Sequence, residues 1–466
     1  MNKDGSVMRA CSLFLLWAAA GVTLPAQTFI TLHNFAGPEG SAPNAVLVQG
    51  IDGNFYGTAF GGGSNGSGTI YKITPSGVLT TIYNFCSLSG CADGLNPQNQ
   101  LILGADGAFY GTTDAGGTST ACSGGCGTVY RFKNGILTTL HSFELTDGET
   151  PQAGLVQGID GNFYGTTQFG GPPTSSGTLY EITPTGDLTT LANFDDSGYL
   201  TYSSLILATD GNLYGTTHTG GVNGGGTVYK LGSSGLTTLY SFNGTVGYNP
   251  SAGLAEGTDG NFYGTTDLGG TTPFDGTIFK ITPTGTYTTL HDFDLLDGSR
   301  PLTIPGMVLG TDGNFYGTTS FGGLAGLGTI FEITPSGTLT VLGIFRGPDG
   351  ELPVTGLIQG TEGAFYGTTP QGGATGLGTV FTLSTGLGPF VQPVPTWAAA
   401  GSHIRILGTN LTGATSVTFN GLAASFTVVS GSEITTTVPE GATRGVVQVV
   451  TPAATLSSKL PFHVLP

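Results

Sequence analysis

Five acidic residues recur in one sequence context and are the strongest candidates for binding chemistry in this 466-residue chain. Each precedes a glycine and, a few residues later, a proline: Glu39, Asp93, Asp147, Asp297 and Asp349. Carboxylates in equivalent loops could form a ring that holds Ca²⁺ or a polyhydroxyl ligand. They could also be structural, because Asp-Gly starts a turn and proline stiffens it. We predict these five as ligand-binding candidates, with Ca²⁺ as the candidate cofactor.

No catalytic constellation stands out in the sequence. Residues 61–66 match both the GxSxG and the GxGxxG patterns. Both matches lie in one glycine-rich loop with no helix after it, so neither mechanism has the context that it needs. His33, His141 and His291 share one repeat position, but other residue types replace them elsewhere. We therefore predict neither catalytic nor metal-ligating residues.

Four cysteines follow the N-terminal leader: Cys86, Cys91, Cys122 and Cys126. An even count in an exported chain favours disulfides. Three pairings are possible, and the local one joins Cys86 to Cys91 and Cys122 to Cys126. The alternative is a four-thiolate zinc site, although these spacings are looser than those of a CxxC pair.

The N-terminus has the pattern of a secretory signal peptide over residues 1–26. Lys3 and Arg9 form a basic start, and the apolar run at residues 11–22 is too short to span a membrane as an ordinary helix. No second long apolar run follows. We expect export, a secreted or cell-surface location, and no transmembrane segment once the signal is removed.

The formal charge of −17 is concentrated before residue 388. An acidic body without a basic patch excludes nucleic acid as a partner, because phosphates need Lys and Arg. The charge fits a soluble protein, which we expect to be a monomer. Its partner would be an extracellular protein or glycan.

The strongest pattern is a repeat of the motif FYGT or LYGT every 49 to 54 residues. Its tyrosines are Tyr56, Tyr110, Tyr164, Tyr214, Tyr263, Tyr316 and Tyr366. Each copy contains four short strand-like runs between turn residues, which is typical of a β-propeller blade. We expect the glycine of each motif to let neighbouring blades approach closely.

The two ends of the array complement each other. The seventh copy lacks a fourth run, and residues 29–35 (FITLHNF) match the fourth run LTTLHSF at residues 137–143. The sequence therefore predicts that an N-terminal strand completes the last of seven blades and closes the ring, which removes exposed sheet edges.

The repeat disappears after residue 387. Residues 389–395 (PFVQPVP) read as a stiff linker. Beyond them, short β-runs are predicted at residues 403–407, 416–419, 425–429, 433–438, 445–450 and 460–464. This strand density over about 80 residues predicts a small immunoglobulin-like β-sandwich.

Two resemblances follow from these motifs. The repeat DGNFYGTT with GG, GT[IVL][YF]xIT and LTTLxxF resembles the GloVer tandem repeat of bacterial exported proteins. The tail resembles an IPT/TIG domain, on the segments ILGTN at 406–410, VTFNG at 417–421 and GVVQV at 445–449. The first resemblance implies an exported protein of no established activity. The second implies an extracellular spacer or interaction module.

The sequence thus predicts an all-β chain of three parts: a signal peptide at 1–26, a seven-bladed β-propeller at 27–387 and an IPT/TIG domain at 388–466. We expect an exported, non-enzymatic binding or scaffolding protein of unknown ligand. The alternative is a polysaccharide-acting propeller hydrolase or lyase that uses the carboxylates of the loop ring.

Overall fold

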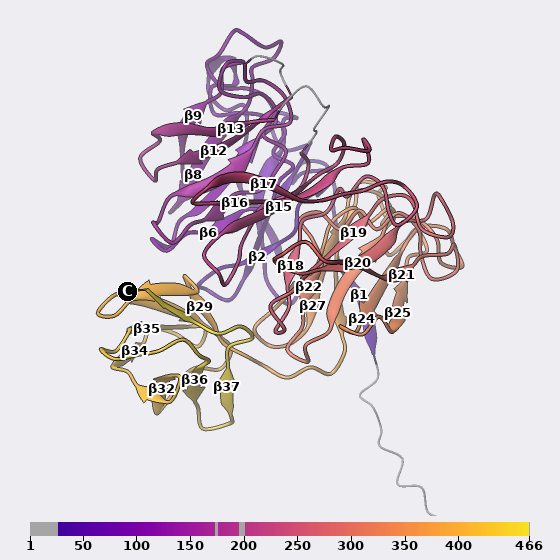
Figure 1. Cartoon of the computed structure of the whole chain (residues 1–466). Helices are drawn as coiled ribbons and strands as arrows, with labels where there is room; N and C mark the ends of the chain where they lie inside the picture. The colour runs from indigo at the N-terminus through magenta and orange to yellow at the C-terminus, as the bar shows by residue number, and fades with distance from the viewer. Residues whose placement is uncertain (1–26, 173–175, 195–200, 466) are drawn as a thin grey trace, which may run out of the picture.

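The computed structural model describes residues 27–172, 176–194 and 201–465. The signal peptide expected at residues 1–26 lies outside the described residues and stays a prediction. The described chain is all-β apart from one short 3₁₀ turn at Ser89–Cys91. Figure 1 shows the repeat region (residues 28–384) from indigo to orange, with the C-terminal region (residues 390–465) in yellow against one end of it.

The described repeat region contains seven antiparallel sheets of four strands each. The first strands are β2 (Val48–Gln49), β6 (Ile102–Leu103), β10 (Val156–Gln157), β14 (Ile206–Leu207), β18 (Ala255–Glu256), β22 (Val308–Leu309) and β26 (Ile358–Gln359). The second strands are β3 (Phe55–Ala59), β7 (Phe109–Thr113), β11 (Phe163–Thr166), β15 (Leu213–Thr217), β19 (Phe262–Thr266), β23 (Phe315–Thr319) and β27 (Phe365–Thr369). The third strands are β4 (Thr69–Ile73), β8 (Thr128–Lys133), β12 (Thr178–Ile182), β16 (Thr227–Gly232), β20 (Thr277–Ile281), β24 (Thr329–Ile333) and β28 (Thr379–Ser384). The fourth strands are β5 (Leu79–Asn84), β9 (Ile136–Ser142), β13 (Leu188–Asn193), β17 (Gly235–Ser241), β21 (Tyr287–Asp292), β25 (Leu339–Ile344) and β1 (Thr28–Asn34).

The hairpin between the first and second strands is built by the Asp-Gly pair before each motif. In the first sheet, Gly53 has a φ of +78°, a conformation that glycine adopts without strain. The carboxylate of Asp52 accepts bonds from the Asn54 backbone N–H at 3.2 Å and from the Tyr56 hydroxyl at 2.9 Å. The aspartate therefore fixes both the turn and the tyrosine that follows it. Five further sheets repeat the bond between aspartate and tyrosine.

Six of the seven motif tyrosines pack on the motif phenylalanine of the next sheet, and Tyr164 meets Leu213 at the same position. The ring centroids of Tyr110 and Phe163 are 4.0 Å apart, and those of Tyr316 and Phe365 are 4.1 Å apart. The same contact joins the last sheet to the first, because Tyr366 lies 4.1 Å from Phe55. Aromatic pairs at this distance stabilise the fold beyond the effect of burying their surface. The two adjacent motif side chains, Phe-Tyr in six sheets and Leu213-Tyr214 in the fourth, thus connect each sheet to both of its neighbours.

The motif glycine has a different role from the one expected. A Cβ on Gly57 would lie 2.5 Å from the hydroxyl of Tyr71, which is its partner on β4 in the same sheet. The other six motif glycines face an aromatic ring of the third strand in the same way. A glycine is therefore needed at this position because the aromatic ring of the third strand occupies the space that a side chain would fill. The close approach of neighbouring blades is not the main reason for these glycines.

Strand β1 pairs with β28 and forms the fourth strand of the last sheet. The pairing runs from Thr28 opposite Ser384 to Asn34 opposite Thr379. The ring of Phe29 lies edge-on against Phe345 and Phe381, with centroids 5.2 and 5.5 Å away. Strand β1 is thereby held in a sheet whose other strands come from the seventh repeat.

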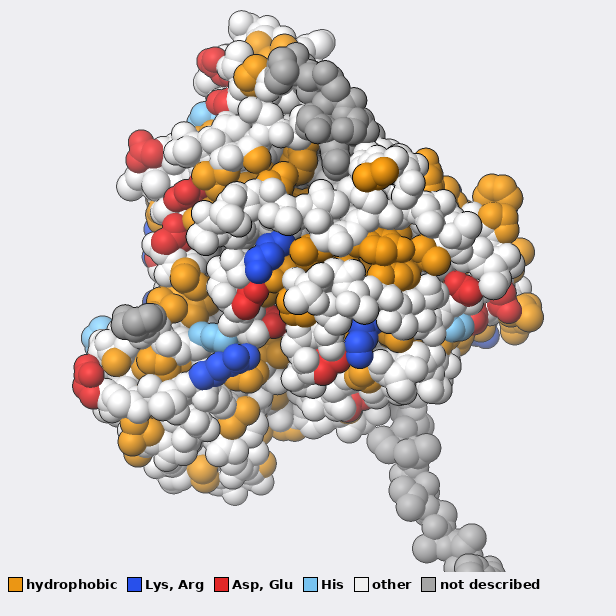
Figure 2. Space-filling model, in the orientation of Figure 1, with side chains coloured by type: hydrophobic (Ala, Val, Ile, Leu, Met, Phe, Trp, Pro, Cys, Tyr) orange, Lys and Arg blue, Asp and Glu red, His pale blue; other side chains and the backbone are white. Residues whose placement is uncertain are grey.

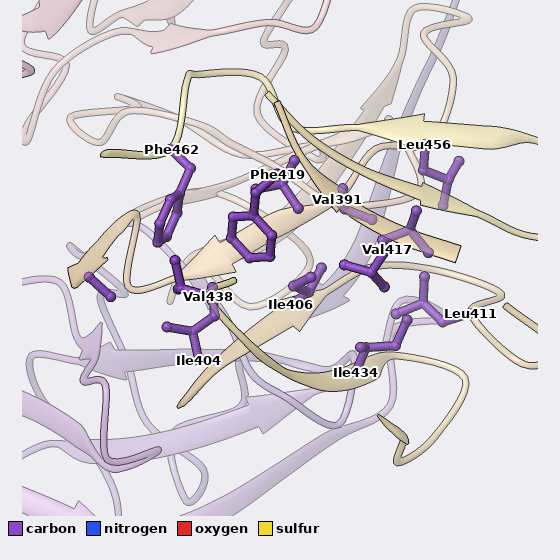
Figure 3. Close-up of a cluster of buried hydrophobic side chains, with 13 residues drawn as sticks. Val391, Ile404, Ile406, Leu411, Val417, Phe419, Ile434, Val438, Leu456 and Phe462 are labelled. Carbon is purple, nitrogen blue, oxygen red and sulfur yellow. The ribbon is translucent and has the colours of Figure 1, made fainter. Parts of the chain in front are cut away.

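The C-terminal region has two four-stranded sheets, ordered β29-β31-β35-β34 and β33-β32-β36-β37, and a parallel pair, β30-β38. The strands are β29 (Gln392–Val394), β30 (Trp397–Ala399), β31 (His403–Leu407), β32 (Ser416–Phe419), β33 (Leu422–Ala423), β34 (Phe426–Val428), β35 (Glu433–Thr437), β36 (Val447–Val450), β37 (Thr455–Ser457) and β38 (His463–Leu465). Figure 3 shows Val391 within the hydrophobic core between the sheets. The expected linker is therefore wrong in part, since residues 391–394 supply a core side chain and a paired strand.

Removal of residues 28–34 should strongly destabilise the protein. The deletion exposes the edge of β28 and uncovers Phe345 and Phe381, and loss of one large aromatic side chain from a core alone costs about 3–5 kcal/mol. We expect a lower melting temperature and aggregation, measured by calorimetry and light scattering. A synthetic peptide of residues 27–36 should restore the melting temperature, whereas a scrambled peptide should not. Normal stability of the truncated protein would contradict the role of β1.

Replacement of Tyr71 by Phe should stabilise the protein. The described residues provide no hydrogen-bond partner for the buried hydroxyls of Tyr71, Tyr130, Tyr180 and Tyr229. The other three sheets have Phe at this position. Removing an unpaired buried hydroxyl should gain about 1 kcal/mol of unfolding free energy in chemical denaturation. The matched control, Phe279→Tyr in the fifth sheet, should lose stability, and a loss in Tyr71→Phe would contradict the expectation.

Candidate functional site

The first strands of all seven sheets line one cavity of about 570 Å³. Seven aliphatic side chains at one repeat position border it and keep accessible surface: Val48, Ile102, Val156, Ile206, Ala255, Val308 and Ile358. The residue before each of them is buried between the sheets, since successive side chains of a strand point to opposite sides. The repeat therefore produces an apolar cavity of the size that proteins use for small ligands.

Polar residues of the cavity wall are bonded to a neighbouring sheet. The side-chain oxygen of Gln49 accepts the backbone N–H of Thr361 at 3.0 Å, and that of Gln157 accepts the N–H of Ala105 at 3.0 Å. Glu256 takes the same role in the fifth sheet by accepting the backbone N–H and the hydroxyl of Thr209. Burial raises the pKa of Glu256 above its ordinary value. These groups thus connect adjacent hairpins around the cavity.

The C-terminal region covers one end of this cavity. The Ser432 hydroxyl donates to the carbonyl of Ile51 at 2.8 Å, and the hydroxyls of Thr361 and Thr409 are 2.8 Å apart. Residues 390–397 and 458–460 line the cavity beside the first strands. The region therefore lies on the hairpin face, defined here as the face with the turns between first and second strands.

Lys459 brings a cation to the covered end. It lies in the segment between β37 and β38 and lines the cavity. Its Nζ donates to the carbonyl of Leu309 at 3.1 Å and lies 4.7 Å from the ring centroid of Phe390. Burial lowers the pKa of Lys459 to about 8. No sequence pattern marks this lysine as functional.

The five predicted carboxylates lie in separate loops, and three of them pair with a histidine of their own sheet. The ring nitrogen Nε2 of His33 is 2.6 Å from Glu39, that of His141 is 2.9 Å from Asp147, and that of His291 is 2.8 Å from Asp297. Their other bonds come from backbone N–H groups in the same loops. Sequence reasoning missed these pairs, although each histidine precedes its carboxylate by six residues.

The other two carboxylates are also bonded within their loops. Asp93 is fully buried and accepts the Tyr83 hydroxyl at 2.8 Å and the Ser87 backbone N–H at 2.9 Å. Asp349 accepts the backbone N–H of Arg346 at 2.6 Å. Residues 27–172, 176–194 and 201–465 contain no group of three His, Cys, Asp or Glu side chains placed to hold a metal ion. A ligand-binding or Ca²⁺-binding role for the five carboxylates stays a prediction.

The structure has disulfides between Cys86 and Cys91 and between Cys122 and Cys126, which confirms disulfides and shows the local pairing. The first lies in the connection from β5 to β6 and the second in the loop from β7 to β8. The backbone carbonyl of Cys91 accepts N–H groups of Gly94 and Gly117, one from each loop. The disulfides thus brace the loop face, defined here as the face opposite the hairpin turns.

Exposed apolar side chains gather on the loop face of the fifth and sixth sheets. This loop patch consists of Phe274, Leu295, Leu296 and Leu324, which are 74, 63, 72 and 84% exposed. Its loops touch, because the N–H of Gly323 donates to the carbonyl of Leu295 at 2.9 Å. Figure 2 shows hydrophobic side chains protruding at the right edge, near the loops beyond β21, and acidic side chains scattered without a continuous patch.

Comparison with protein families gives two matches. The Gloeobacter/Verrucomicrobia repeat matches residues 20–209, 121–306, 196–381 and 303–405. The IPT/TIG domain matches residues 390–464. Both resemblances expected from the sequence are confirmed. No curated protein matches the chain.

Solved structures show the fold. The extracellular domain of a protein assigned as a hybrid two-component system from B. thetaiotaomicron has a TM-score of 0.52 at 12% identity over 92% of this chain, which spans only 46% of that domain. A fungal alcohol oxidase of the AA5 family, in complex with copper, has a TM-score of 0.51 at 12% identity, with 94% and 99% of the two chains covered. The TM-scores support a propeller-like fold, and at 12% identity these similarities carry no conclusion about activity. No described helix is long and apolar enough to cross a membrane.

Asp93 should make stability fall in acid. Burial raises its pKa, but hydrogen bonds from Ser87, Tyr83 and Leu88 outweigh burial and hold the pKa below the ordinary value. Asp93 therefore stabilises the fold above about pH 4, and this contribution is lost as pH falls through the lowered pKa. Asp93→Asn should cost about 1–3 kcal/mol at pH 7 and flatten the acid limb of stability against pH. Asp187→Asn, at an exposed turn, serves as control, and an unchanged acid limb in Asp93→Asn would refute this role.

Proposed function

The chain belongs to the Gloeobacter/Verrucomicrobia repeat family and ends in an IPT/TIG domain, and from this premise we propose that it is an exported, non-enzymatic binding or scaffolding protein. Its contact surface is the loop face. Its architecture is a seven-bladed β-propeller at residues 27–387, closed by the N-terminal strand, with the IPT/TIG domain at 388–466.

Three contacts support a closed ring. Strand β1 pairs with β28, and Tyr366 of the last sheet packs on Phe55 of the first. The Gln49 side chain of the first sheet also accepts the N–H of Thr361 from the last. The contacts of Tyr366 with Phe55 and of Gln49 with Thr361 are of the same kind as those between consecutive sheets, which supports the first and last sheets as adjacent blades.

The loop patch is the observation that carries the binding role. Large apolar side chains that are mostly exposed and close together are characteristic of interaction surfaces, because their contact with water is unfavourable and a partner would bury them. Two loops of the patch are tied together, since Arg300, in the loop of Leu295 and Leu296, forms a two-bond ion pair with Asp267, in the loop of Phe274, at 2.8 and 2.7 Å. A preorganised apolar surface binds a protein partner with little loss of conformational entropy.

Export is supported by the disulfides, because disulfides persist in oxidising compartments and are rare in the cytosol. We expect the mature chain outside the cytoplasm, where the loop face meets its partner.

The loop patch can be tested with a triple variant, Phe274→Ser, Leu296→Ser and Leu324→Ser. Labelled protein should bind to the envelope of the producing cells, and the triple variant should bind at least about tenfold more weakly, because buried apolar contacts at an interface centre dominate affinity. Fluorescence titration and photo-crosslinking from position 274 measure this loss.

The matched control carries Val78→Ser and Ile136→Ser, which remove exposed apolar side chains elsewhere in the repeat region. The control should bind like the unaltered protein. Equal binding by all three proteins, or no binding by any, would refute the proposal that the loop face is the contact surface.

A further inference from the structure

The cavity along the first strands is separate from the loop patch and has its own chemistry. Its aliphatic border is contributed once by each sheet, and Leu103, Leu207 and Leu309 of alternate sheets extend the apolar wall. At about 570 Å³, it is within the size range of small-molecule pockets. An apolar wall of this extent favours an aliphatic ligand, because burial of each methylene is favourable by about 0.8 kcal/mol.

A single cation lies at one end of this wall among the described lining residues. The ammonium of Lys459 can donate three hydrogen bonds. In the structure it donates to the Leu309 carbonyl and rests over the Phe390 ring. No carboxylate of the described residues lies within ion-pair distance of it. A cation in an apolar site without an anion is costly, so an incoming anion would be stabilised there.

The other charged lining residue, Glu256, does not compete for Lys459. Its two oxygens accept the backbone N–H and the hydroxyl of Thr209 in the neighbouring sheet. The cavity is therefore asymmetric, with a cation at the covered end and aliphatic side chains along the wall.

We propose that this cavity binds a single-chain aliphatic carboxylate, such as a medium-chain fatty acid. Its carboxylate pairs with Lys459, and its chain lies along the seven aliphatic side chains. Because the lysine comes from the C-terminal region and the wall from the repeat sheets, the ligand contacts both parts and holds them together.

Calorimetric titration of the full chain after signal removal tests this site with decanoate and with decanol, which has the same chain and no charge. Decanoate should bind at least about tenfold more tightly than decanol. Lys459→Met should abolish this preference and leave decanol binding unchanged. The control Lys72→Met, which removes an equal charge outside the cavity, should behave like the unaltered protein.

Two further measurements test the site without relying on the Lys459→Met variant. Ala255→Phe, which fills the cavity at its smallest border residue, should abolish binding of both probes. In unaltered protein with isotopically methylated lysines, decanoate should raise the pKa of Lys459, which burial holds near 8, because the carboxylate stabilises the charged form. Equal affinity for the two probes, or an unmoved Lys459 titration, would overturn the proposal.

Discussion

The packing of each motif tyrosine on the first motif residue of the following sheet, a phenylalanine in six sheets and Leu213 in the fourth, is the contact on which the repeat region depends. A single sheet of four strands, with first strands of two residues, cannot bury its two faces alone. The adjacent Phe and Tyr point to opposite faces because a strand alternates its side chains. One motif therefore supplies both halves of the contact between sheets, and the hairpin aspartate holds the tyrosine hydroxyl at the rim.

Because one short motif supplies these contacts, features that depend on local sequence are predicted well. The hairpins and strands depend on local patterns, so residues 403–407 and 416–419 form β31 and β32 at the expected bounds. The pairing of the first strand follows from a missing run at residue 384 and a surplus run at residue 29. The role of the motif glycine was harder to predict, because it requires knowing that Tyr71 lies opposite Gly57 on the next strand.

The candidate sites were less predictable for the same reason. Glu39, Asp147 and Asp297 repeat because each completes a pair with a histidine on the outer strand, and the path of the loop decides whether a carboxylate faces its own loop or a ligand. Lys459 gains its position from the contact between the two regions, more than 140 residues away from its partner Leu309. Such long-range contacts produce no periodic pattern in the sequence and therefore could not be predicted from it.

The two faces of the repeat region differ in what they carry. The hairpin face bonds to the IPT/TIG domain through backbone carbonyls and hydroxyls, which any repeat copy can offer. The loop face carries the disulfides, the histidine–carboxylate pairs and the apolar patch, and its loops differ most between copies.

The position of β1 also constrains how the polypeptide matures. Asn34 bonds to Ala374 across 340 residues, so the last sheet cannot be finished until nearly the entire repeat array has left the ribosome. Until then β1 has no partner strand, and the sheets already made cannot close on the last one. Such long-range pairing makes folding slow. Strand β1 is therefore synthesised before every other strand of the repeat region and can be paired only after β28 has been made.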